Sequence, residues 1–140
     1  MQGLNTTPVH GHTALFGVYG MLGIGLTLFV LKGLSKQNPW KESVIKFSFW
    51  SLNIGLLLMV LLSVLPVGLA QTVASVDEGM WYARSAEFNQ QEYIRTFKWL
   101  RFIGDTIFAV GSITLTYFIF GLRFGWSLKT EKLKKTLANN

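Results

Sequence analysis

The chain's only two histidines, His10 and His12, stand at the beginning of a long apolar stretch. Successive residues of an α-helix are rotated by about 100°, so residues two apart project to nearly opposite sides. A single metal ion would need ligands four residues apart, on one face of the helix. Opposed imidazoles can instead each bind a separate centre, and this geometry suits two haems on either side of one helix. Two other interpretations stay open, namely a capping or loop pair and a structural hydrogen-bonded pair.

Small residues follow the histidines at helical spacing. Ala14 and Gly17 come four and seven residues after His10, and Gly23 lies below the side that carries His12. A flat macrocycle needs such a smooth surface beside its ligand. Small residues also let helices approach closely in a membrane, so helix packing explains the same glycines equally well.

The composition is typical of a membrane protein. Half of the 140 residues are hydrophobic and 14% are charged, too apolar for an ordinary soluble domain, and the chain is too short for several domains. We therefore predict an all-α membrane protein, a single segment with three transmembrane helices. The absence of cysteine excludes disulfides and thiolate metal sites. The net charge of +6 comes from lysines beside apolar segments, where they set topology, which argues against nucleic-acid binding.

The uncharged runs predict where the helices lie. We expect helices at about 10–33, 44–69 and 98–123, an outer loop at about 70–97 and a basic cytoplasmic tail at 124–140. An apolar stretch of about 20 residues is enough to cross a hydrocarbon core of about 30 Å.

Two details of these helices follow from single residues and a short pattern. Pro66 should kink the second helix near its end, and Gly68 should loosen it. Tyr93, Phe97 and Leu100 recur at i, i+4 and i+7. This spacing predicts a short amphipathic lead-in that lies at the interface ahead of the third span.

Four polar residues in or near the spans are candidates for a role. Asn53 should form an interhelical hydrogen bond, which is a commoner use of asparagine in lipid than catalysis. Arg84 and Arg101 could hold haem propionates, because guanidinium groups match carboxylates, although solvated salt bridges are the more frequent use of such arginines. Asp105 is either a functional group at membrane depth or a solvated first-turn residue favoured by the helix dipole.

Three stretches, in order, resemble one known family: His10–Leu31, Phe49–Leu56 and Gly79–Phe88. From His10 to about Gly121 the chain resembles the C-terminal end of the large subunit of bacterial nitric oxide reductase, in the haem-copper oxidase superfamily. The resemblance implies that the three helices correspond to the last three helices of a haem-copper oxidase subunit I fold.

The resemblance also implies different roles for the two histidines. His10 matches the proximal ligand of the high-spin haem b3, and His12 matches one axial ligand of the low-spin haem b. The family's complete subunit reduces nitric oxide to nitrous oxide, taking electrons from a quinol or a cytochrome c. Its second axial histidine and its non-haem iron, held by three histidines with glutamates, belong to earlier helices. We therefore expect a truncated or split subunit that is inactive alone and needs the remaining helices or a split partner chain.

The lysines predict the orientation in the lipid bilayer. The loop after the first helix carries Lys32, Lys36, Lys41 and Lys46 against one acid, the tail is more basic still, and the outer loop is balanced. By the positive-inside rule the amino end is outside and the carboxyl end inside. The resemblance implies a multi-pass protein of the bacterial inner membrane. Two alternatives stay open: a fragment of an oxygen-reducing haem-copper oxidase, and a small non-catalytic membrane scaffold protein.

Overall fold

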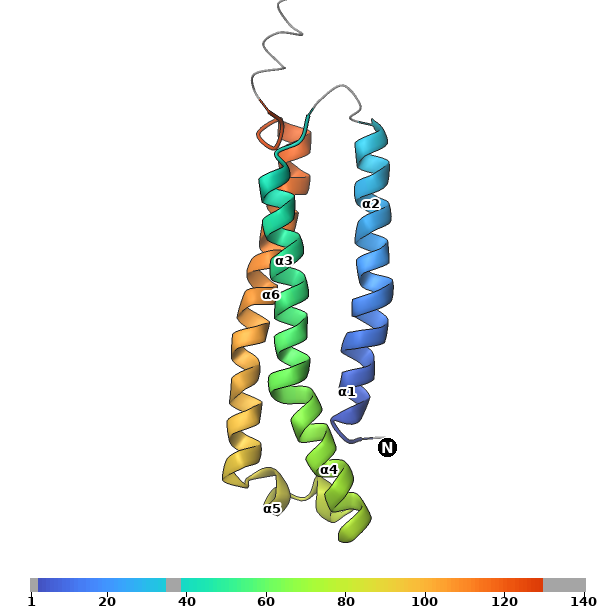
Figure 1. Ribbon diagram of the computed structural model, residues 1–140, viewed down its shortest axis with the longest axis vertical. Helices are drawn as coiled ribbons and strands as arrows, with labels where there is room; N and C mark the ends of the chain where they lie inside the picture. Colours follow the sequence, from blue (N-terminus) through green and yellow to red (C-terminus); the bar gives the residue numbers. More distant parts are fainter. Residues whose placement is uncertain (1–2, 35–38, 130–140) are drawn as a thin grey trace, which may run out of the picture.

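The computed structural model describes residues 3–34 and 39–129, in which the helices form three long rods. The rods run side by side in Figure 1. The first rod consists of α1 (Thr6–His10), the π-helical segment η1 (Gly11–Gly20) and α2 (Met21–Leu34). The second consists of α3 (Glu42–Met59), the π-helical segment η2 (Val60–Val64) and α4 (Leu65–Asp77). The third is α6 (Glu92–Phe124), preceded by the 3-10 helix η3 (Tyr82–Arg84) and by α5 (Ala86–Asn89).

Each rod is long and apolar enough to cross a membrane. The candidate spans are Thr6–Leu34, Glu42–Asp77 and Glu92–Phe124. Since each of them exceeds the roughly 20 residues that one crossing needs, the predicted fold class is confirmed: the described chain is helical, with three candidate membrane spans.

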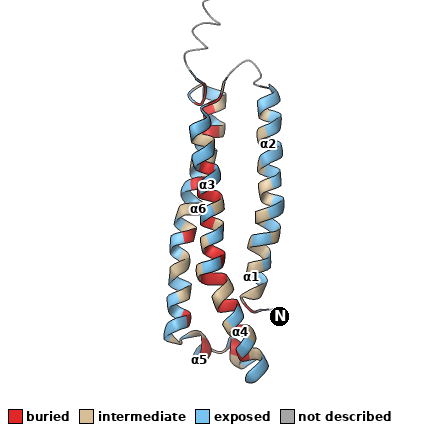
Figure 2. Ribbon diagram, in the orientation of Figure 1, coloured by how far each residue is buried: buried red, intermediate tan, exposed pale blue. Residues whose placement is uncertain are grey.

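The second and third rods pack directly against each other, and most of the buried residues in Figure 2 lie along them. A Cβ added at Gly55 of α3 or at Gly104 of α6 would lie 2.5 Å from a backbone nitrogen of the facing helix. Neither position can therefore carry a side chain unless the helices move apart. Near the middle of this contact the buried Ser48 hydroxyl donates a hydrogen bond to the Gly111 carbonyl oxygen at 2.8 Å. Close backbone approach of this kind is how helices associate in lipid.

Buried apolar clusters close the two ends of this pair. One joins the amino end, α4, the connecting turns and the start of α6: Leu4, Val67, Ala74, Ala83, Phe88 and Ile94. The other lies where α3 begins and α6 ends: Trp40, Phe118 and Leu128. In contrast, α1, η1 and α2 contain no buried residue, so the first rod is largely uncovered by the rest of the chain (Figure 2).

The second rod differs from the expectation near its end. The helix continues past the predicted end near residue 69 to Asp77. The predicted bend is present, since η2 immediately precedes the turn containing Pro66 and α4 leaves the axis of α3 in Figure 1. The predicted loosening at Gly68 is wrong. Gly68 is buried, and a Cβ there would lie 2.9 Å from the Thr6 backbone nitrogen, so this glycine is a close contact with the first rod.

The third rod begins earlier than expected, at Glu92, and the separate amphipathic lead-in is not found. The residue that anchors this part is Ile94, which is 0% exposed, whereas Tyr93 is 49% exposed. The Ile94 side chain lies in the buried cluster beside α4. This contact holds the first turn of α6 against the second rod, and α6 runs without a break from Glu92 to Phe124. Lys36 and residues 130–140 of the expected basic tail lie outside the described residues.

Candidate functional site

The imidazole of His12 is held in one orientation by its own helix. Its Nδ1 lies 2.7 Å from the carbonyl oxygen of Pro8. A carbonyl can only accept a hydrogen bond, so Nδ1 carries the proton and donates it. The other ring nitrogen, Nε2, then keeps its lone pair and can serve as a metal ligand.

Arg101 of α6 faces that second nitrogen. Its Nη2 lies 3.4 Å from Nε2 of His12, and a guanidinium only donates, so Nε2 is the acceptor. One turn further along α6, the Asp105 carboxylate accepts from Arg101 Nε at 3.2 and 3.3 Å. These two side chains are 42% and 45% exposed, so their pairing stabilises the fold by no more than about 1 kcal/mol. The same guanidinium therefore contacts both Asp105 and His12.

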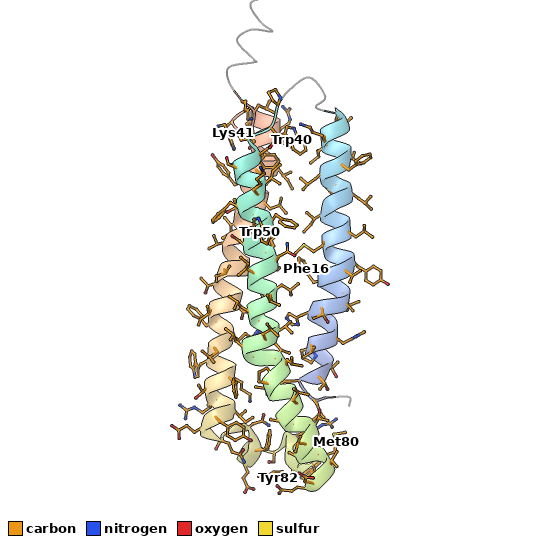
Figure 3. All side chains as sticks on the ribbon, viewed as in Figure 1. Phe16, Trp40, Lys41, Trp50, Met80 and Tyr82 are labelled. Atoms are coloured by element: carbon orange, nitrogen blue, oxygen red, sulfur yellow. The ribbon has the colours of Figure 1, made fainter. Side chains whose placement is uncertain are left out.

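A groove of about 620 Å³ opens beside these groups, within the range of about 300–1,000 Å³ usual for cofactor and ligand sites. Its lining draws on all three rods and is mostly apolar: Pro8, Gly11, His12, Leu15, Phe16, Met59, Arg101, Asp105 and Phe108. Phe16 and Phe108 meet edge to face, with ring centroids 5.0 Å apart, and Figure 3 shows Phe16 on the side of the first rod that faces α3.

The lining of the groove has the chemistry that a haem site needs. It offers an imidazole nitrogen with a free lone pair, apolar walls, and a guanidinium that can meet a carboxylate. Because Arg101 contacts the same nitrogen that an iron would take, the guanidinium has to move away from Nε2 when a haem binds.

His10 lies apart from this groove. It ends α1, is exposed, and is not among the groove's lining residues. His10 and His12 therefore do not line the same groove, and the segment that follows His10 is π-helical and not α-helical. Such segments are rare and are frequent near functional sites. Within residues 3–34 and 39–129, no three His, Asp or Glu side chains converge on a possible metal-ion site.

The other candidate residues lie elsewhere. The Arg84 guanidinium lies over Gly3, where an added Cβ would be 2.6 Å from Nη2. Among the described residues, the interhelical bond expected of Asn53 is not found, and its amide instead donates to the Phe49 carbonyl oxygen of its own helix at 2.8 Å. Of the small residues, a Cβ added at Gly17 would lie 3.4 Å from the Leu56 side chain of α3, whereas one added at Gly23 would meet nothing within 4 Å.

The sequence matches the family model described as Cytochrome C and Quinol oxidase polypeptide I over residues 1–107. This chain belongs to that family. The matched region includes both histidines, Arg101 and Asp105. Complete subunits of this haem-copper oxidase family contain haem, which agrees with the chemistry that the His12 groove offers.

A more specific similarity exists within the haem-copper oxidase family. A nitric oxide reductase subunit of Stutzerimonas stutzeri is 26% identical to this chain over 127 residues, which cover 83% of this chain and 25% of that protein. The chain therefore spans about a quarter of the length of this relative.

Sequence reasoning missed how the groove of this haem-copper oxidase chain is assembled. The i, i+4 spacing of Arg101 and Asp105 was a usable signal for their pairing, but nothing in the sequence shows that the pair faces His12. Met59 of α3 also lines the groove, and its backbone lies against Gly104 of α6. Gln71, which is 4% exposed, was also missed. It accepts from the Asn5 backbone nitrogen at 2.7 Å and donates to the Ala83 carbonyl at 3.2 Å.

Proposed function

We propose that this chain supplies the last three membrane helices of a nitric oxide reductase catalytic subunit, in which His12 binds the low-spin haem b and His10 binds the high-spin haem b3. The observation that carries the proposal is the His12 imidazole, whose Nδ1 is tied to the Pro8 carbonyl at 2.7 Å while Nε2 faces the groove. The similarity to the nitric oxide reductase of Stutzerimonas stutzeri supports the choice of reaction within the family.

The residues of this chain act by binding and orienting. The Pro8 carbonyl fixes the ring and the tautomer of His12, so that Nε2 is the ligand. Arg101, once displaced from Nε2, binds a haem propionate, and Asp105 holds the guanidinium at the groove. His10 binds the second haem on the uncovered side of the same rod. When bound, the haem b3 iron supplies the centre at which two nitric oxide molecules, two electrons and two protons give nitrous oxide and water.

Other parts of the enzyme come from outside this chain. The first rod has no buried residue, so a haem on its His10 side needs walls from earlier helices of the subunit or from a split partner chain. Those helices would also supply a further ligand for haem b and the ligands of a non-haem iron, which requires imidazole and carboxylate groups. Electrons come from a quinol or a cytochrome c.

Co-expression with a polypeptide carrying the earlier helices tests this function. Membranes with both polypeptides should consume nitric oxide when an artificial electron donor is supplied, and membranes with this chain alone should not. The His10→Ala variant of the complex is the control and should be inactive. Turnover by the solitary chain above that control would overturn the proposal. Oxygen consumption without nitric oxide consumption would show that the parent is an oxygen-reducing oxidase instead.

We further propose that the amino end and the turn at residues 78–91 face the outside of the bacterial inner membrane, and that the α2–α3 connection faces the cytoplasm. Lysines at that connection support this sidedness through the positive-inside rule. Reporter fusions at Leu34 and at Asn89 should report opposite sides. The same side for both fusions would contradict the proposed topology.

A further inference from the structure

A second groove, of about 560 Å³, lies on α6 near the end where the chain leaves the helix. Its apolar walls come from residues at helical spacing and from the turn that follows: Ile113, Tyr117, Phe120, Phe124 and Trp126. All of these side chains are exposed. The groove lies beyond residues 1–107, the part of the chain that matches the family.

The turn after α6 builds one wall of this groove. Gly125 adopts φ 92°, a left-handed conformation that favours glycine, and its N–H bonds to the Gly121 carbonyl oxygen at 2.8 Å. The chain therefore reverses, and the Trp126 indole folds back over α6. The indole stacks on Phe124 with centroids 5.2 Å apart and on Tyr117 with centroids 5.7 Å apart. The groove is thus shaped by a specific backbone turn and by stacked rings.

The backbone beyond this turn is fastened to the start of the second rod. Lys41 N–H donates to the Ser127 carbonyl oxygen at 2.9 Å, and Lys129 N–H donates to the Pro39 carbonyl oxygen at 2.8 Å. Figure 3 shows Trp40 and Lys41 at this end of the molecule. These bonds hold the chain on both sides of Trp40 close to the end of α6.

The same end of the molecule is strongly basic. We define the basic end as the cations where α2 ends, α3 begins and α6 ends (Figure 1): Lys32, Lys41, Lys46, Arg123 and Lys129. Among the described residues there, the acid is Glu42, which pairs with Lys46 at 3.8 Å. Arg123 is exposed and follows Thr116, a groove residue, by seven positions, which places it two turns further along the same side of α6.

We propose that this groove binds an anionic phospholipid, with an acyl chain along the aromatic wall of α6 and the phosphate at Arg123. Three features favour this occupant over a neutral lipid or another helix. The groove is apolar along a membrane-spanning helix, an indole stands at its end as at membrane interfaces, and the neighbouring charge is positive. Clusters of lysine and arginine just beyond a membrane helix attract anionic lipid headgroups.

Native mass spectrometry of the full chain, purified in detergent, tests the proposal. The probes are phosphatidylglycerol and phosphatidylcholine with identical acyl chains, added in equal amounts. The wild-type chain should retain phosphatidylglycerol preferentially. Arg123→Gln should lower the ratio of the two adducts about fivefold, the effect of one cation near a membrane surface. Thr116→Phe, which fills the groove, should reduce both adducts.

Arg95→Gln is the matched control, because it removes an exposed arginine from the opposite end of the same helix and should leave the ratio unchanged. Circular dichroism should show the same helicity for all three variants. Equal retention of both lipids by the wild-type chain would overturn the proposal. So would an equal loss of selectivity in Arg95→Gln and Arg123→Gln, or unchanged adducts in Thr116→Phe.

Discussion

The first rod and the α3–α6 pair differ in how closely they pack against the rest of the chain. In the α3–α6 pair, glycines bring the two backbones so close that an added Cβ would lie 2.5 Å from a nitrogen of the facing helix. In the first rod no residue is buried, and a Cβ at Gly23 would meet nothing within 4 Å. Yet the first rod carries both histidines. The least buried rod is therefore the one that carries the candidate ligands, and the α3–α6 pair contributes residues to the groove beside His12.

This contrast explains why one half of the candidate site is better defined than the other. The His12 side faces the tight pair, which contributes Arg101, Asp105 and Phe108 to the groove. His10 is exposed and is not among the residues that line that groove. A haem at His12 would thus use surface from this chain, whereas a haem at His10 would depend on other helices.

The largest difference between the two regions is expected when a glycine in each is replaced by alanine, which adds one methyl group. Gly104→Ala should destabilise the protein by about 1–3 kcal/mol, because the new Cβ forces α3 and α6 apart. Gly23→Ala should be neutral or stabilising, since it adds a good helix former in open space. Reversible unfolding in mixed detergent micelles measures both changes. Equal destabilisation by the two substitutions would show that the first rod is packed as tightly as the pair.

A smaller effect is expected where the amino end is tied to the second rod. Gln71→Leu should cost about 1–2 kcal/mol locally, because the Asn5 N–H and the Ala83 carbonyl lose their buried partner. Hydrogen exchange at the Asn5 amide should speed up, while exchange at the centre of α3 should not. The matched control is Gln90→Leu, which changes an exposed glutamine. Similar exchange at Asn5 in both variants would exclude the Gln71 link.

The smallest effect on stability is expected at the contact between His12 and Arg101. Arg101→Gln removes a half-exposed ion pair and should change the free energy of unfolding by less than about 1 kcal/mol. It should weaken haem retention by the assembled subunit, because a propionate loses its guanidinium partner. Lys98→Gln, three residues earlier on α6, is the control. Haem titration of both variants checks the difference, and equal haem affinity would remove Arg101 from the site.

The sequence was most informative where one physical rule decides the outcome. Long uncharged runs predict membrane spans because an unpaired backbone group in lipid is costly, and a helix pairs all of its backbone groups within one segment. Helix geometry also predicts different sides for His10 and His12, and His10 is not among the residues that line the groove beside His12. The resemblance to a haem-copper oxidase subunit likewise came from ordered motifs in the sequence, and the family match agrees with it.

Features that depend on packing between distant segments were harder to predict. Gly68 was expected to loosen a helix, but it is a contact point for the backbone of Thr6. Asn53 was expected to form a hydrogen bond to another helix, but its amide donates to the Phe49 carbonyl oxygen, one turn earlier in the same helix. The contact between Arg101 and His12 joins residues 89 positions apart. It therefore depends on where the first rod lies relative to α6, which no local sequence pattern predicts.

Separate ligation by the two histidines is tested most directly by absorption spectra of the assembled subunit carrying His12→Ala or His10→Ala. We predict that His12→Ala removes the low-spin haem b signal and retains the high-spin signal, because His10 does not share its groove. His10→Ala should disturb the high-spin haem b3 and leave the low-spin signal in place. Identical spectra from the two variants, or wild-type spectra from both, would contradict separate haem ligation by His10 and His12.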